Sequence, residues 1–184
     1  MDHLQKLLRA AHFAAEMHSG QNRKGGKREP YINHPLEVAN LVANIGLVND
    51  IDILMAALLH DTVEDCGVEA AEFTSKFGTR TCGIALEVTD DKDLPKKRRR
   101  DLQVEHAPHL SHGAKSEKLA YKISNCHELM DNAPTNWDTK RLSDYIQWGC
   151  YVVRGLGEAN EPLEPIFDKV VARAEAKFNS RFVF

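Results

Sequence analysis

The sequence lacks the features that mark secreted, membrane-spanning and disulfide-bonded proteins. Its four cysteines form no C-x-x-C pair, which argues against both a zinc knuckle and a disulfide framework. No apolar run approaches the length that a bilayer requires, and the first twenty residues lack the apolar core and cleavage site of a signal peptide. We therefore expect a cytoplasmic protein with no membrane segment.

An excess of charge of one sign is also missing. The net charge is -3 in 184 residues, so the sequence predicts no general affinity for nucleic acid or for an anionic membrane. Any anion must therefore be bound by a local group of side chains. The length and a hydrophobic fraction of 42% suit a single globular domain over residues 1–184.

Segments that alternate apolar and polar residues are absent as well, and helical spacing takes their place. The clearest case is residues 51–65, in which apolar side chains recur at Ile51, Leu54, Met55, Leu58 and Leu59. Further helices are expected at 3–18, from Pro35 to Gly46, and at 69–89 with a break at Gly78, 95–106, 113–131, 138–155 and 161–178. The sequence therefore predicts an all-α fold, a compact bundle of about eight or more short helices.

A histidine and three carboxylates end the helix at 51–65, in the stretch AALLHDTVEDC. His60 and Glu64 lie four residues apart, as do Asp61 and Asp65, so each pair shares a helix face. His60 and Asp61 suit a divalent ion, and the acids one turn later could position or deprotonate a water molecule. Because helices often end in charged residues, a solvated helix end is the alternative interpretation.

A second histidine favours the ion site. His34 stands directly before Pro35 in the stretch YINHP, at the start of a predicted helix. The proline fixes the backbone there, so that a ligand would lose little conformational entropy on binding an ion.

The order RK, PYINHP, ALLHDTVED and EVTDDKDLPK along the chain resembles the small alarmone hydrolases, including those similar to the metazoan SpoT homolog. These are stand-alone relatives of the hydrolase half of RelA/SpoT proteins within the HD-domain phosphohydrolase superfamily. The resemblance runs from AAHFAAEMHSGQNRK to LSDYIQWGCYVVRGL and covers nearly the whole chain. It implies an HD-domain helical bundle that uses bound manganese to hydrolyse the 3′-pyrophosphate of (p)ppGpp, giving GDP or GTP and pyrophosphate.

The resemblance also implies roles for individual residues. The manganese ligands would be His34, His60 and Asp61, and the pair that handles the attacking water would be Glu64 and Asp65. The residues that would contact the nucleotide are Arg23, Lys24, Asn125, Arg141 and Tyr145.

The sequence departs from the family at the fourth metal ligand. The family has an aspartate in a segment close to KLADKLYNL, and residues 118–126 here read KLAYKISNC, which places Tyr121 at the ligand position. A neutral phenol is a poor ligand for a divalent ion. The neighbourhood differs too, because Ser116 and Glu117 stand where the family is apolar and Ser124 replaces an aromatic residue.

Two interpretations of this departure remain. In one, His34, His60 and Asp61 form a two-histidine, one-carboxylate set, water fills the remaining positions and hydrolysis persists. In the other, the ion is lost and the domain binds nucleotide in a regulatory role. The retained pair Glu64 and Asp65 favours the enzyme, because adjacent carboxylates repel each other and serve no purpose in an inactive site. Removal of the 2′-phosphate of NADPH is a related enzymatic alternative.

Two basic stretches and several aromatic residues complete the candidates. RKGGKR at 23–28 contains Arg23 and Lys24, and KDLPKKRRRD at 92–101, with its run 96–100, could guide an anionic nucleotide or simply be a solvated helix face. The histidines of EHAPHLSH at 105–112 are expected on the surface, and Trp137 and Trp148 in the core. The sequence gives no oligomeric state.

Overall fold

The structure is a computed structural model that describes residues 2–184, and within this range it is built from helices and loops. The helices are α1 (His3–Met17), α2 (Asn33–Asn40), a π-helical turn η1 (Leu41–Ile45), α3 (Ile51–Cys66), α4 (Ala70–Phe77), α5 (Thr79–Val88), α6 (Lys96–His106), a 3-10 turn η2 (Ala107–His109), α7 (His112–Asp131), α8 (Thr139–Leu156) and α9 (Glu164–Phe178). No strand occurs in residues 2–184, where Asn22 and Pro30 form an isolated antiparallel bridge. The all-α prediction is confirmed.

Local sequence signals explain where the helices begin and end. Asp2 and Gln5 form a capping box at the start of α1, and the side chain of Asp50 accepts the backbone N–H of Asp52 at the start of α3. α3 ends at Cys66 and is followed by Gly67, whose φ of 70° lies in the left-handed region that glycine adopts without strain. The predicted break at Gly78 separates α4 from α5, so the segment 69–89 forms two helices.

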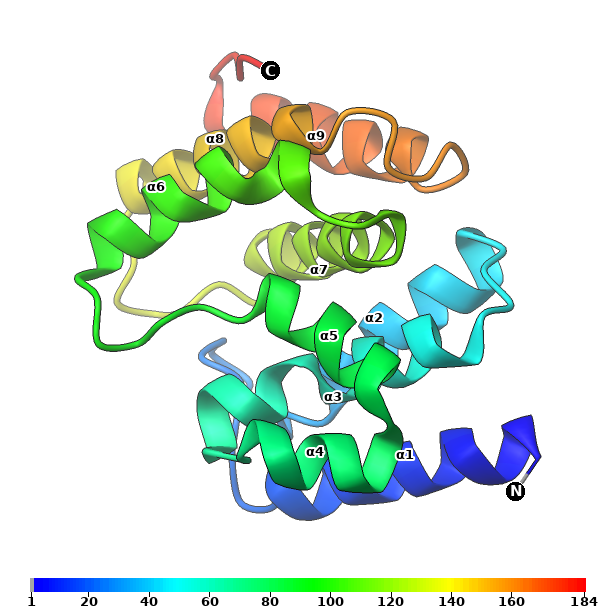
Figure 1. Cartoon of the computed structure of the whole chain (residues 1–184). Helices are drawn as coiled ribbons and strands as arrows, with labels where there is room; N and C mark the ends of the chain where they lie inside the picture. The colour runs from blue at the N-terminus through cyan, green and yellow to red at the C-terminus, as the bar shows by residue number, and fades with distance from the viewer. Residues whose placement is uncertain (1) are drawn as a thin grey trace.

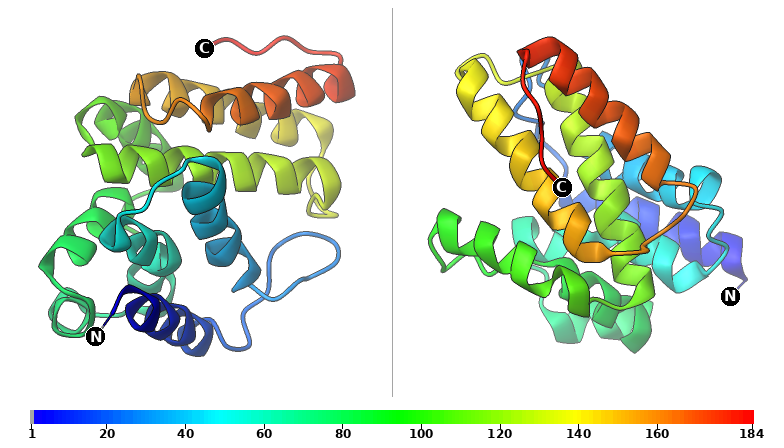
Figure 2. Two further views of the ribbon diagram at one scale, coloured as in Figure 1. Left: turned by 90° about the vertical axis from the view of Figure 1, so that its right-hand side faces the viewer. Right: turned by 90° about the horizontal axis from the view of Figure 1, so that it is seen from above.

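The long helix α7 lies in the middle of the molecule, between two groups of helices (Figures 1 and 2). On one side it packs against α8 and α9, and on the other side against α2, α3 and α5. α1 completes this second group by packing along α3. None of the helices in residues 2–184 is long and apolar enough to cross a membrane.

Burial of α3 carries the helix end into the interior. Its buried residues run from Ile53 to Thr62 with Leu54 partly exposed, and they include His60 and Asp61, which are 4% and 5% exposed. A solvated helix end is therefore the wrong interpretation for these two residues. Because burying polar groups costs free energy unless they find partners, the contacts of His60 and Asp61 need an explanation.

Candidate metal centre and nucleotide pocket

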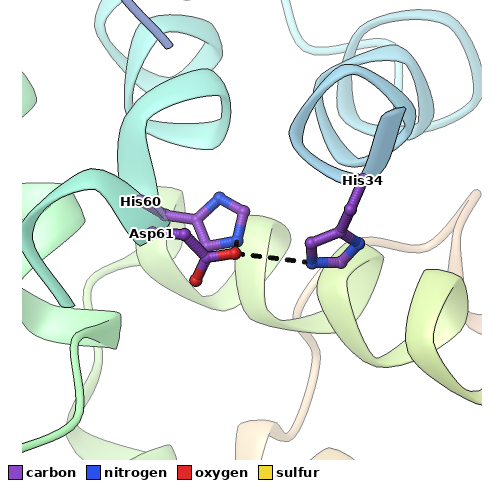
Figure 3. Close-up of side chains that lie close together, drawn as sticks. All are labelled: His34, His60 and Asp61. Atoms are coloured by element: carbon purple, nitrogen blue, oxygen red, sulfur yellow. Dashed lines mark ion pairs between the residues drawn. The ribbon is translucent and has the colours of Figure 1, made fainter. Parts of the chain in front are cut away.

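Two neighbouring helices bring three possible metal ligands together. His34 comes from the first turn of α2, and His60 and Asp61 come from the last turns of α3 (Figure 3). Asp61 Oδ2 lies 3.0 Å from His60 Nε2 and 3.8 Å from His34 Nε2. Each residue offers one ligand atom within 4.8 Å of the others, and this is the one such group found in residues 2–184.

The hydrogen bonds of the two histidines leave the same ring atom of each free. His60 Nδ1 lies 2.8 Å from the carbonyl oxygen of Ala57, and because a carbonyl only accepts, Nδ1 must carry the proton. His34 Nδ1 lies 2.9 Å from Ser124 Oγ. Both Nε2 atoms are buried and have no hydrogen-bond partner within residues 2–184. Two imidazole nitrogens that face one carboxylate oxygen are a donor set that fits a divalent ion, which would displace the second ring proton of His60.

The titration of the three residues agrees with this arrangement. Burial opposes ionisation of Asp61, but the adjacent His60 outweighs it and holds the pKa of Asp61 below its usual range. For His60, burial lowers the pKa, but the carboxylates of Asp61 and Glu117 more than offset it and the pKa rises to about 9. Burial lowers the pKa of His34, so its ring is neutral at pH 7.

Tyr121 closes the side of the cluster where the fourth ligand is absent. Its ring lies edge-on to both imidazoles, with centroids 5.2 Å from that of His34 and 5.5 Å from that of His60. Burial raises the pKa of Tyr121 well above its usual value, so the phenol stays neutral. Beside it, His60, Asp61, Glu64 and Glu117 border a cavity of about 10 Å³, which is room for roughly one water molecule.

The structure adds Tyr31 to the cluster. The hydroxyl of Tyr31 donates to Asp61 Oδ2 at 2.7 Å and lies 3.1 Å from Asp65 Oδ2. It therefore connects the candidate ligand Asp61 to the candidate acid pair. Tyr31 stands in the YINHP stretch, but a phenol with a high pKa offers no signal in the sequence that separates it from a core aromatic residue.

The acid pair Glu64 and Asp65 is partly buried at the same helix end. Burial raises the pKa of Glu64, whose Oε2 accepts the backbone N–H of Asp90 at 3.1 Å. Lys92 forms an ion pair with Asp65, and its amine lies 3.9 Å from Glu64 Oε1. Lys92 was part of the EVTDDKDLPK match but received no role from the sequence, because a lone lysine in a loop does not reveal which carboxylates it meets.

A basic pocket lies beside the cluster. It has a volume of about 630 Å³, and its lining includes five cations and no acidic residue; these are Arg23, Lys24, Arg28, Lys96 and Arg141. Burial and the neighbouring cations, Arg100 first among them, lower the pKa of Lys96. The guanidinium of Arg141 lies 4.3 Å from the ring centroid of Trp137, which also lines the pocket. Trp137 and Trp148 are partly buried against the core as expected, and the ring of Trp137 also forms a wall of the pocket.

Arg23 connects the pocket to the cluster. Its guanidinium lies 5.7 Å from the ring centroid of Tyr31, donates to Asn125 Oδ1 at 3.0 Å and pairs with Glu128. Arg23, Lys24 and Arg141 thus share one pocket, and Asn125 supports it from α7. Tyr145 lies behind the wall, with its ring 5.9 Å from that of Trp137 and 5.2 Å from that of Trp148. The structure therefore places Tyr145 outside the pocket lining.

Comparison with known proteins places this arrangement in a family. A model described as HD domain matches residues 10–126. The guanosine-3′,5′-bis(diphosphate) 3′-pyrophosphohydrolase MESH1 of Xenopus tropicalis is 48% identical over 88% of this chain and 90% of its own length, and the human MESH1 is 46% identical over 86% and 89%. A solved structure described as a metazoan ortholog of SpoT that hydrolyzes ppGpp superposes with a TM-score of 0.88 at 38% identity, covering 91% of this chain and 94% of that one.

These matches agree with the resemblance drawn from the sequence and extend over nearly all of the chain and of its relatives. The chain therefore belongs to the HD-domain family and, within it, to the group that includes the MESH1 proteins.

Proposed function

We propose that the protein is a metal-dependent hydrolase that removes the 3′-pyrophosphate of (p)ppGpp, giving GDP or GTP and pyrophosphate. The observation that carries this proposal is a buried two-histidine, one-carboxylate cluster beside a pocket lined by five cations. Relatives that share nearly the whole chain bear the name of this activity. A nucleotide with two pyrophosphate groups matches a pocket of that charge.

We propose manganese as the ion, with His34, His60 and Asp61 as its protein ligands. Manganese accepts both nitrogen and oxygen ligands, and a divalent ion in this place would lower the pKa of a bound water and neutralise charge on the phosphoryl oxygens. Tyr121 contributes no anionic oxygen, so water would fill the positions that the protein leaves open. We also propose a cytoplasmic location, where a nucleotide of this kind is available.

Glu64 is the proposed general base. Burial raises the pKa of its carboxyl, which brings it closer to neutral pH and makes the carboxylate a better proton acceptor. Asp65 is held by Lys92 on one side and by the Tyr31 hydroxyl on the other, so its proposed role is to orient the water. The two acids thus have different tasks because their surroundings differ.

The basic pocket is the proposed nucleotide site. The side chains of Arg23, Lys24 and Arg141 would bind phosphate oxygens, to which guanidinium groups can donate paired hydrogen bonds. Trp137 offers an aromatic face on which a base can stack. Asn125, which accepts from Arg23, would hold that guanidinium in place.

The test is to incubate purified protein with ppGpp and manganese and to separate the products by anion-exchange chromatography. We expect GDP and pyrophosphate in equal amounts, and no product from the His60→Ala variant, which loses one proposed ligand. NADPH is assayed in parallel for release of phosphate. If ppGpp binds in calorimetry but is not cleaved at micromolar protein, the hydrolase proposal is wrong and the domain is a nucleotide-binding module.

A further inference from the structure

A chain of three side chains leads from the surface to the buried histidine of α2. The hydroxyl of Ser124, on α7, donates to Glu37 Oε2 at 2.7 Å. The same hydroxyl oxygen lies 2.9 Å from His34 Nδ1. Ser124 and His34 are both buried, whereas Glu37 is exposed. The order Glu37, Ser124, His34 therefore ends at a proposed ion ligand.

The number of available protons decides which group donates in each of these two hydrogen bonds. A serine hydroxyl has one proton, and because a carboxylate only accepts, that proton is donated to Glu37. Ser124 Oγ must then accept from His34, so that His34 Nδ1 carries the proton of the neutral ring. The other nitrogen, Nε2, is left with its lone pair directed at Asp61 Oδ2, 3.8 Å away. The two hydrogen bonds thus select the tautomer of His34 that can bind an ion through Nε2.

The Nδ1 atoms of the two histidines are held by different kinds of partner. His60 donates Nδ1–H to the carbonyl of Ala57 in its own helix, so the partner of its Nδ1 is a backbone atom. Within residues 2–184, the one partner of His34 Nδ1 is the Ser124 hydroxyl, and the charge of Glu37 strengthens that bond by polarising it. A side-chain substitution can therefore remove the support of His34 but not that of His60.

We propose that Ser124 and Glu37 are positioning residues that fix the tautomer and direction of His34 for ion binding. The inference rests on the proposed ion site and adds to it two residues to which neither the composition nor the helical pattern gave a role. Partners of this kind typically change metal affinity by about 10- to 100-fold. Such support matters more where the protein supplies only three ligands and Tyr121 stands beside them.

The first experiment reads the tautomer directly in ion-free protein, by ¹⁵N NMR of the histidine side chains. We expect His34 to be protonated at Nδ1 in the unchanged protein. In the Ser124→Ala variant, where the acceptor is gone, we expect a signal from the tautomer protonated at Nε2. A His34 ring protonated at Nε2 in the unchanged protein would overturn the proposal, whatever the protein does with metal.

The second experiment measures the affinity for manganese alone, by counting free ions with electron paramagnetic resonance. Ser124→Ala should weaken binding about 10- to 100-fold. The matched control is Ser116→Ala on the same helix: Ser116 is equally buried and also donates one hydrogen bond, to the carbonyl of Ala159 at 3.2 Å. The control variant should bind manganese as the unchanged protein does. Equal affinity in Ser124→Ala and the unchanged protein would overturn the proposal.

A double substitution shows whether Glu37 acts through Ser124. Glu37→Gln retains an accepting oxygen but removes the charge, so it should weaken binding less than Ser124→Ala. In the Ser124→Ala background it should have no further effect, because the connection is already broken. If Glu37→Gln weakens binding equally in both backgrounds, Glu37 acts only as a distant charge. The proposed hydrogen-bonded series Glu37, Ser124, His34 is then wrong.

These results are separable from a failure of the proposed function. Suppose that the unchanged protein binds manganese and cleaves ppGpp while the Ser124 and Glu37 variants bind manganese equally well. In that case only the proposed role of Ser124 and Glu37 is wrong. If the unchanged protein binds no manganese, the proposed ion site and the proposed role of Ser124 and Glu37 are both wrong.

Discussion

The Tyr31 hydroxyl donates to Asp61 Oδ2, the same carboxylate oxygen that faces the two histidine Nε2 atoms. The two residues are 30 positions apart and meet because the YINHP segment lies against the end of α3. Burial raises the pKa of Tyr31, which keeps the hydroxyl protonated and able to donate. Tyr31 thus fixes the direction of Asp61 without adding negative charge to the cluster.

Replacement of Tyr31 by phenylalanine should therefore destabilise the ion-free protein. A hydrogen bond to a charged group contributes roughly 1.5–3 kcal/mol, and we expect the free energy of unfolding in urea to fall by that amount. Tyr151→Phe is the control, because Tyr151 is 45% exposed on α8. A loss no larger than that of the control would show that the bond to Asp61 contributes nothing to stability.

Replacement of Tyr121 by aspartate should strengthen manganese binding by about tenfold or more, because it restores an anionic oxygen beside His34 and His60. Activity at limiting manganese should rise with it. Calorimetric titration of each protein with manganese measures the affinity. The same affinity in both proteins would mean that position 121 does not face the ion.

Manganese affinity should rise with pH. The pKa of His60 is about 9 in the ion-free protein, so below that pH an ion must displace a proton from the ring. Proton and ion therefore compete for the same ring nitrogen of His60. As the pH rises from 6 to 8, the proton competes less, and the apparent affinity for manganese should rise by up to about tenfold per pH unit. Calorimetry in buffers of different ionisation enthalpy counts the protons released. An affinity that is constant from pH 6 to 8 would contradict the assignment of His60 as a ligand.

The basic pocket gives a prediction with a control one residue away. Lys96→Ala should raise KM for ppGpp about tenfold, the effect of losing roughly 1.4 kcal/mol of binding, and should leave kcat nearly unchanged. Lys97 follows Lys96 in α6, but its side chain is 90% exposed and pairs with Asp101 instead of lining the pocket. Equal KM values for the Lys96→Ala and Lys97→Ala variants would place the nucleotide elsewhere.

The helices were predictable because their signals are local. Periodic apolar residues located α3, and Gly78 located the break between α4 and α5. The second helix begins at Asn33, two residues before the expected Pro35, and its last turn is a π-helix ending at Ile45. A sequence pattern cannot specify such a turn, because the choice between α and π hydrogen bonding depends on how the helix packs.

The site was predictable only where its residues belong to a motif. His34, His60 and Asp61 stand in conspicuous stretches, and the structure brings them together. Tyr31 and Glu37 gain meaning only from the fold, because their partners lie on other elements. Lys92 and Lys96 belong to a basic stretch that the sequence offered for anion guidance, and the fold shows which groups each of them meets.

The positions of α7 that differ from the family, among them Ser124 and Glu117, also gain meaning only from the fold. Ser124 read as a departure from the family and is in fact the hydrogen-bond partner of His34. Glu117 is buried beside His60, with its Oε1 3.8 Å from Nδ1, and burial raises its pKa to about 7.

The proposed ion site is tested most directly by a crystal of the protein grown with excess manganese and measured at the manganese absorption edge. We predict one strong anomalous peak in contact with His34 Nε2, His60 Nε2 and Asp61 Oδ2, with water on the side of Tyr121. A well-ordered map that shows only water among these three atoms would contradict it.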